Sequence, residues 1–166
     1  YFFHLVMAGL CLGLAGDFLL LKERLFVPGL SAFLLGHLFY TVAWSSVPWS
    51  LPLWLAMLLP LVGILYGIQF TRRLRIRGRS GYFAPVWVYL IIITGMLSSA
   101  ASLEFAITRG FPYTALGAAL FCLSDSLLAW NRMIRPFVQA QFWILGTYYT
   151  AQTLLVFGAM DFLRRF

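Results

Sequence analysis

Six long apolar segments, separated by short polar breaks, dominate the pattern along the chain. Each runs for about 20 residues, the length of an α-helix that crosses a bilayer. The segments cover 3–21, 26–44, 49–70, 83–103, 112–130 and 137–160. The breaks between them are rich in Pro, Gly, Ser and Arg, which are typical of turns. Because the runs are continuously apolar rather than alternating, the pattern predicts helices and not the strands of a membrane barrel.

Composition points to a membrane protein and excludes secreted disulfide scaffolds, disordered tails and ordinary cytosolic enzymes. Of the 166 residues, 62% are hydrophobic and 10% are charged, whereas soluble domains are about 45–50% apolar and about 25% charged. Two cysteines, Cys11 and Cys122, are too few for a disulfide framework. The sequence therefore predicts an all-α, polytopic transmembrane helix bundle. We expect six helices, one domain over 1–166, and an integral, multi-pass location.

Positive charge gathers on one side of the predicted bundle. The basic residues on that side are Lys22, Arg24, Arg72, Arg73, Arg75, Arg77, Arg79, Arg132 and Arg135, against Arg109, Arg164 and Arg165 on the other. Because basic loops stay in the cytoplasm, we expect the first group to be cytoplasmic and both chain ends to lie on the opposite side, as in a bacterial inner-membrane protein. The net charge of +7 then reflects topology, and no nucleic-acid partner is expected.

Two aspartates fall inside apolar segments at similar depths. An Asp at the centre of a membrane helix costs about 2.5–3.5 kcal/mol on insertion scales, so such residues are rare and usually functional. Asp17 precedes Lys22 by five residues and Asp125 precedes Arg132 by seven. At the helical rise, both lie about 7–10 Å below the same boundary. We therefore expect the two carboxyls to meet inside the bundle. The other ionisable candidates are His4 and His37, with Glu104 and Asp161 interpreted as solvated ends of segments.

Small residues accompany both aspartates and indicate that they face inward. Small side chains allow membrane helices to approach closely. The stripes are Gly9, Gly13 and Gly16 beside Asp17, and Ala118, Cys122 and Ala129 beside Asp125. Polar residues that share a face and would extend a cavity are His37, Tyr40, Thr41 and Trp44 in one segment, and Gln141, Leu145, Tyr148 or Tyr149, and Gln152 in another.

The two aspartate segments also show a short internal similarity. AGDFLLLK (15–22) resembles LSDSLLAWNR (123–132), and each is followed by a Gly–Tyr–Thr element, at 36–41 and 146–150. The spacing from Asp17 to Tyr40 is 23 residues, and that from Asp125 to Tyr149 is 24. Both hairpins would run in the same direction, so the pattern suggests a parallel internal repeat.

Several functions remain open on the residues alone. The aspartates could bridge helices by hydrogen bonds, or bind protons or cations in a small polytopic transporter or proton-coupled carrier. Neither aspartate lies in the Gly-x-Gly-Asp or Tyr-Asp pattern of an intramembrane aspartyl protease, and the inward polar faces disfavour a scaffold. No His/Asp ligand spacing accompanies them, so we expect neither a metal nor a cofactor.

Four segments resemble the lysoplasmalogenase (YhhN-like) membrane family: MAGLCLGLAGDFLLL (7–21), FLLGHLFYTVAW (33–44), GAALFCLSDSLLAWNRM (117–133) and TYYTAQTLLVFGA (147–159). Members are integral membrane hydrolases that cleave the vinyl ether bond of lysoplasmalogens, which yields a fatty aldehyde and glycerophosphoethanolamine or glycerophosphocholine. The resemblance implies that Asp17 and Asp125 are catalytic. It implies substrate-binding positions at His37, Tyr40, Tyr149 and Gln152. It also implies that the family's first two helices would precede the segment at 3–21.

The implied chemistry suits a pair of carboxyls. Vinyl ether hydrolysis needs an acid that protonates carbon and a carboxylate that stabilises an oxocarbenium ion or activates water, as in glycosidases. We hypothesise that Asp17 and Asp125 share these roles. The vinyl ether lies just below the lipid phosphate, which Lys22, Arg24, Arg132 and Arg135 would hold. The expected partners are a lysophospholipid substrate and the bilayer, and the oligomeric state stays open.

Overall fold

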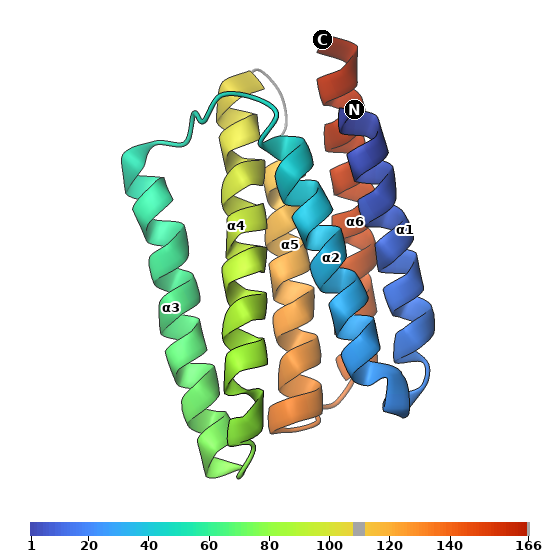
Figure 1. Cartoon of the computed structure of the whole chain (residues 1–166), viewed down its shortest axis with the longest axis vertical. Helices are drawn as coiled ribbons and strands as arrows, with labels where there is room; N and C mark the ends of the chain where they lie inside the picture. The colour runs from blue at the N-terminus through green and yellow to red at the C-terminus, as the bar shows by residue number, and fades with distance from the viewer. Residues whose placement is uncertain (108–111, 166) are drawn as a thin grey trace.

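The computed structural model describes residues 1–107 and 112–165, and these form helices without any strand. The helices are α1 (Phe2–Leu20), α2 (Phe26–Trp44), α3 (Leu53–Ile76), α4 (Phe83–Ile107), α5 (Tyr113–Ala129) and α6 (Ala140–Arg165). Short helical turns join them at η1 (Glu23–Leu25), η2 (Ser80–Tyr82) and η3 (Trp130–Ile134). The long helices run side by side (Figure 1). The prediction of an all-α bundle of six helices is confirmed.

Length and composition allow most of these helices to cross a membrane. Among the described residues, five helices are long and apolar enough, and they correspond to α1 through α5. The helix α6 is not one of the five, and its middle is more polar because it carries Thr147, Thr150 and Gln152 among apolar residues. The chain is therefore a multi-pass membrane protein.

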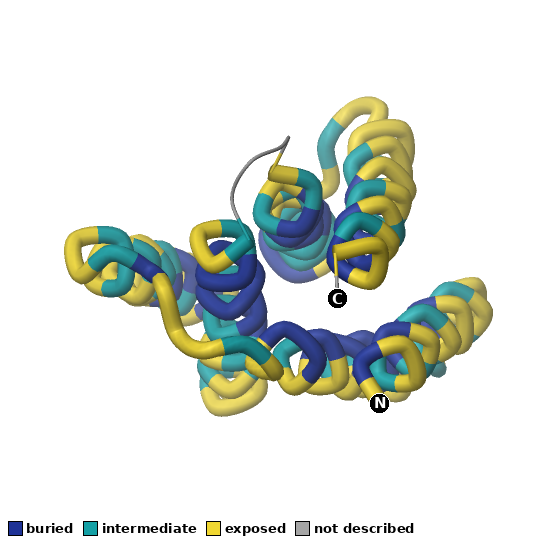
Figure 2. The backbone as a smooth tube through the Cα atoms, turned by 90° about the horizontal axis from the view of Figure 1, so that it is seen from above, coloured by how far each residue is buried: buried dark blue, intermediate teal, exposed yellow. Residues whose placement is uncertain are grey.

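Two helical hairpins pack on either side of α4. The strongest packing is between α1 and α2 and between α5 and α6, while α4 lies between α2 and α5. The helix α3 packs mainly on α4 and stands at the edge of the bundle in the end-on view of Figure 2. Both chain ends lie at one end of the bundle, opposite the α1–α2, α3–α4 and α5–α6 connections (Figure 1). We call the end with those connections the basic end, since it carries the Lys22–Arg24, Arg72–Arg79 and Arg132–Arg135 groups.

Glycines allow the paired helices to approach closely. A Cβ atom added at Gly36 of α2 would lie 3.2 Å from the carbonyl oxygen of Gly9 in α1. One added at Gly117 of α5 would lie 3.0 Å from the carbonyl oxygen of Ala151 in α6. Backbone atoms cannot move aside as a flexible side chain can, so only glycine fits without separating the helices. The predicted stripe in the first segment is buried, at Gly9, Gly13 and Gly16.

The third helix differs most from its predicted range of 49–70. It begins at Leu53, directly after Pro52, and continues to Ile76 through Arg72, Arg73 and Arg75. Arginine is a good helix former. At this end of α3 its positive charge also interacts favourably with the partial negative charge of the helix C-terminus. The helix stops where Gly78 adopts φ of 67°, with hydrogen bonds from the Gly78 and Arg79 amides to the Arg75 and Leu74 carbonyls. These bonds form a Schellman motif, which ends a helix on glycine. Arg72, Arg73 and Arg75 therefore lie in α3 and not in the polar break that was predicted after residue 70.

The fifth helix ends in a wider turn that an arginine holds in place. Residues Trp130–Ile134 form a π-helical turn, a local geometry that is common at functional sites. The Arg79 guanidinium donates to the carbonyl oxygens of Arg132 (3.1 Å) and Met133 (3.0 Å). The α3–α4 connection is thereby tied to the end of α5. Arg109, which was counted on the opposite side, lies outside the described residues.

Candidate functional site

Asp125 lies at the centre of a polar group formed by three helices. Its Oδ2 atom accepts a hydrogen bond from the Tyr89 hydroxyl of α4 at 2.6 Å. The same oxygen lies 3.0 Å from Nε2 of His37 in α2, and that nitrogen is also 3.2 Å from the Tyr89 hydroxyl. The side chain of His37 is buried, with 1% exposed. Residues far apart in the chain therefore hold one carboxyl oxygen in a fixed position.

The protonation pattern of this group follows from its contacts. An ionised carboxylate only accepts hydrogen bonds, so Nε2 of His37 carries the hydrogen when Asp125 is ionised. The opposite ring nitrogen, Nδ1, is then an acceptor. It is buried and has no hydrogen-bond partner within the described part of the chain. The imidazole can thus exchange a proton with Asp125 through a single nitrogen.

Asp17 belongs to a second polar group, which connects α1, α6 and α2. Its Oδ2 atom accepts from the Tyr148 hydroxyl at 3.1 Å. That hydroxyl accepts in turn from Nε2 of Gln152 at 3.1 Å, and Oε1 of Gln152 accepts from the Tyr40 hydroxyl at 3.0 Å. Tyr40 and Tyr148 are both buried. Of the four residues that the resemblance implied as substrate-binding, Tyr40 and Gln152 therefore lie in the same polar group as Asp17.

An aromatic ring separates the two polar groups. The ring of Phe121 lies 4.7 Å from that of His37 and 5.3 Å from that of Tyr148, edge-on to both. Within the described residues no hydrogen bond joins Asp17 to Asp125. The structure thus places both carboxyls inside the bundle, as the stripes of small residues indicated, but in neighbouring groups rather than as a directly bonded pair.

A large cavity adjoins Asp125. It has a volume of about 750 Å³ and lies among α2, α3, α4, α5 and η3. Its polar lining comes chiefly from Asp125, Tyr89, Tyr66 and Ser126, and most of the remaining lining is apolar. Asp17 is not among the described residues that line it. A mainly apolar cavity of this size with a few converging polar groups is typical of a small-molecule site.

Positions along α4 show how deep the polar group lies in this cavity. The lining runs from Tyr82 at the basic end, past Tyr89, to Leu97. Tyr89 is seven residues from Tyr82 and eight from Leu97, so the helical rise puts about 10 Å of cavity on one side of it and about 12 Å on the other. The deeper part is mainly apolar, with Leu59, Ile93 and Leu97 in its walls beside the hydroxyl of Thr94.

Arginines at the basic end lie over aromatic rings near this cavity. The guanidinium of Arg132 is 5.8 Å from the ring centre of Phe26, which lines the cavity, and that of Arg73 is 4.8 Å from Trp130. Arg132 also pairs with the exposed Glu23 at 3.3 Å, an interaction of small strength in water. The other predicted phosphate ligands, Lys22, Arg24 and Arg135, are exposed at the same end. Arg73 was counted only among the basic residues that indicate topology, so its place over the Trp130 ring was not predicted.

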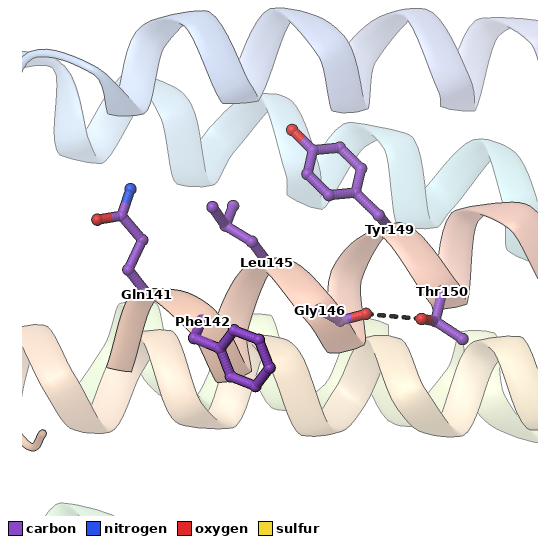
Figure 3. Close-up of a pocket in the computed structure, with 6 residues that line it drawn as sticks. All are labelled: Gln141, Phe142, Leu145, Gly146, Tyr149 and Thr150. Atoms are coloured by element: carbon purple, nitrogen blue, oxygen red, sulfur yellow. Dashed lines mark hydrogen bonds between the residues drawn. The ribbon is translucent and has the colours of Figure 1, made fainter. Parts of the chain in front are cut away.

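The exposed face of α6 carries three side chains that were expected to face inward. Gln141, Leu145 and Tyr149 line a shallow hollow on this face together with Phe142, Gly146 and Thr150 (Figure 3). The Tyr149 side chain is 56% exposed, whereas that of Tyr148 is 6% exposed and contacts Asp17. Tyr148 thus occupies the inward position that the sequence left open between Tyr148 and Tyr149, whereas Tyr149, which the family resemblance implied as substrate-binding, lies on the exposed face. Tyr148 keeps a regular spacing from Asp125. It follows Asp125 by 23 residues, the same spacing as from Asp17 to Tyr40, and this equality was the signal that could have identified it.

The remaining ionisable candidates have ordinary structural surroundings, with one correction. Glu104 was interpreted as a solvated end, but its Oε1 atom accepts from the backbone amide of Thr114 at 2.6 Å. It therefore caps the first turn of α5, where a negative charge is favoured. Asp161 pairs with Arg165 at 2.9 Å near the chain end, and His4 is exposed.

Comparisons with known proteins agree with the sequence resemblance. The model of the YhhN family matches residues 2–159. A protein named lysoplasmalogenase TMEM86B from Homo sapiens is 30% identical over 95% of this chain and 64% of its own length. The Sus scrofa protein of the same name is 32% identical over 84% of this chain and 56% of its own length. Human lysoplasmalogenase TMEM86A is 31% identical, over 94% and 65%.

The chain spans less than two thirds of the length of these curated relatives. No solved structure matches it.

Proposed function

Because this chain belongs to the YhhN family, we propose that it is a membrane hydrolase that cleaves the vinyl ether bond of lysoplasmalogens. The products would be a fatty aldehyde and glycerophosphoethanolamine or glycerophosphocholine. Relatives named lysoplasmalogenase support the reaction class. The observation that carries the proposal is the Asp125 carboxyl, held by Tyr89 and His37 at the wall of an apolar cavity.

The dimensions of the cavity suit a lysophospholipid. Such a lipid has one hydrocarbon chain, a reactive bond near the glycerol, and a phosphate a few ångströms farther out. The apolar part beyond Tyr89 would take the chain, and the stretch between Tyr89 and Tyr82 would take the glycerol. The phosphate would then lie near Arg132 and Arg73, where guanidinium groups favour an anion. The vinyl ether would thereby fall at the level of Asp125.

The reaction needs a proton at carbon and water at the neighbouring carbon. A proton adds to the vinyl carbon remote from oxygen and leaves an oxocarbenium ion. Water adds to that ion and loses a proton, and the resulting hemiacetal breaks its carbon–oxygen bond to release aldehyde and alcohol. We propose that Asp125 delivers the proton and then, as a carboxylate, stabilises the cation, a demand that paired carboxyls meet in glycosidases. Tyr89 and His37 would hold the carboxyl through hydrogen bonds, and Nε2 of His37 would exchange a proton with it.

Asp17 is proposed to contribute from the neighbouring polar group. Its contact is with Tyr148, and the Phe121 ring lies between Tyr148 and His37. We therefore assign the step at the vinyl ether to Asp125. Asp17 would position Tyr148, and through it the ring that forms the wall of the Asp125 group. This division predicts that Asp125→Asn is more damaging than Asp17→Asn.

Mass spectrometry of products tests the reaction. The purified protein in nanodiscs is incubated with a lysoplasmalogen and, in parallel, with the saturated 1-O-alkyl lysophospholipid of the same chain length. The proposal predicts fatty aldehyde from the vinyl ether lipid alone, because the saturated ether has no double bond to protonate. Uptake of a solute into proteoliposomes without any lipid cleavage would instead support a transporter that uses the same aspartates.

A further inference from the structure

The cavity beside Asp125 has an opening between α2 and α3. Residues on both of these helices line it and are nevertheless exposed: Val27 (59%) and Ser31 on α2, and Leu58 (43%) and Val62 (55%) on α3. The strong packing of α2 is with α1 and α4, while that of α3 is with α4. We call these four residues the lips of the opening.

The opening faces the hydrocarbon of the membrane rather than water. Both α2 and α3 are long and apolar enough to span a bilayer. Val62 is eleven residues from Arg73, so it lies about 16 Å from the basic end along the helix. A bilayer core is about 30 Å thick, which places this lip near the middle of the apolar layer. The exposed lip residues of α3 therefore contact lipid chains. On α2, Val27 and Ser31 lie closer to the basic end, next to Phe26 and Leu30, which pack against the cluster of Phe70 and Leu74.

Beyond the basic end of the cavity, in contrast, packed side chains close the path to the surface. Phe70, Leu74, Met133 and Ile134 form a buried cluster there, and Phe70 and Leu74 are almost fully inaccessible. The hydrogen bonds from Arg79 to the carbonyls of η3 hold this cluster against the end of α5. A long apolar chain would have to disrupt this packing to enter from the end.

We propose that the opening between α2 and α3 is a lateral portal for a single hydrocarbon chain of a lysophospholipid. The chain enters sideways from the bilayer while the phosphate stays at the basic end, and the fatty aldehyde leaves by the same path. The apolar lining matches the chain, and the arginines near Phe26 and Trp130 match the anionic phosphate. This inference rests on the proposed function for its substrate, although not for its geometry.

A lip variant and a matched neighbour test the portal. Val62→Trp fills the opening, whereas Leu61→Trp places the same ring one residue away, at a site that is 51% exposed and not part of the described lining. The measurement is photolabelling in nanodiscs by a 1-O-alkyl lysophospholipid with a photoreactive group in its chain. We expect labelling by Val62→Trp to fall about tenfold, equivalent to about 1.4 kcal/mol of binding free energy. Leu61→Trp should label like the natural protein.

A second variant and a second readout make the outcomes distinct. Leu58→Trp, one helical turn from Val62 on the same lip, should reduce labelling as Val62→Trp does, which guards against a folding defect in either one. Equal labelling of Val62→Trp, Leu61→Trp and the natural protein would overturn the portal. If the natural protein is labelled through the lips but releases no aldehyde from a lysoplasmalogen, the portal stands and the proposed hydrolysis fails.

Discussion

Replacement of Tyr89 by Phe removes a single oxygen atom from the Asp125 group. That oxygen donates to Oδ2 of Asp125 at 2.6 Å and lies 3.2 Å from Nε2 of His37. The ring of Tyr89 packs edge-on to that of His37, with centres 5.7 Å apart, and this contact remains in the variant. The substitution therefore tests the hydroxyl while the aromatic packing of the bundle is retained.

The expected effect on turnover is large because the hydroxyl bonds to a carboxyl. A hydrogen bond to a charged group contributes about 1.5–3 kcal/mol, and about 1.4 kcal/mol changes a rate tenfold. If this interaction is needed in the transition state, kcat/KM falls by about 10- to 100-fold. The free energy of unfolding should fall less, by about 1 kcal/mol, which is the net value of a typical hydrogen bond.

Two measurements and one control variant complete this test. Aldehyde release from a lysoplasmalogen gives kcat/KM, and thermal unfolding in detergent shows whether Tyr89→Phe is folded. Tyr149→Phe is the control, because Tyr149 is 56% exposed and is not among the described residues that line the cavity. It should retain normal turnover. A folded Tyr89→Phe protein with turnover equal to that of Tyr149→Phe would refute the assignment of this polar group as the reaction site.

Two further predictions use neighbouring residues as controls. Tyr148→Phe removes the hydrogen bond to Asp17 and should lower aldehyde release severalfold, whereas Tyr149→Phe, on the exposed face, should not; equal effects would contradict the inward position of Tyr148. Gly117→Ala should lower the free energy of unfolding by about 1–3 kcal/mol through overpacking against Ala151. Gly146→Ala meets nothing within 4 Å and should leave thermal stability unchanged or slightly raised. An unaltered melting temperature for Gly117→Ala would show that α5 and α6 can separate at little cost.

The helices could be predicted from the sequence, and so could the bounds of α2, but the ends of α3 could not. A run of about 20 apolar residues is a property of the chain alone, and it located each helix. The end of α3 depends instead on Gly78 and on how well the preceding arginines extend a helix. The start of α3 depends on which of two prolines, Pro48 or Pro52, precedes the first turn. Both ends of α3 are set by local hydrogen bonds and backbone geometry, which a hydropathy pattern does not show.

The inward faces were predictable where small residues marked them and not elsewhere. The glycine stripe beside Asp17 placed that residue inside the bundle. For α6, adjacent residues differ by about 100° around the helix, so the choice between Tyr148 and Tyr149 needed the repeated 23-residue spacing. Tyr89 lies in the first half of α4, where its neighbours are apolar on every side, and no periodicity showed that it faces Asp125. The contact depends on how α4 packs between the two hairpins.

The most direct test of the central claim is product release by Asp125→Asn, measured with binding of the 1-O-alkyl lysophospholipid. General acid–base groups contribute about 10²- to 10⁴-fold to rate, and we expect a loss of aldehyde release in that range. Photolabelling should be unchanged, because Asn has nearly the same size and the apolar cavity is intact. A folded Asp125→Asn protein that releases aldehyde at the natural rate would contradict the claim that this carboxyl performs the hydrolysis.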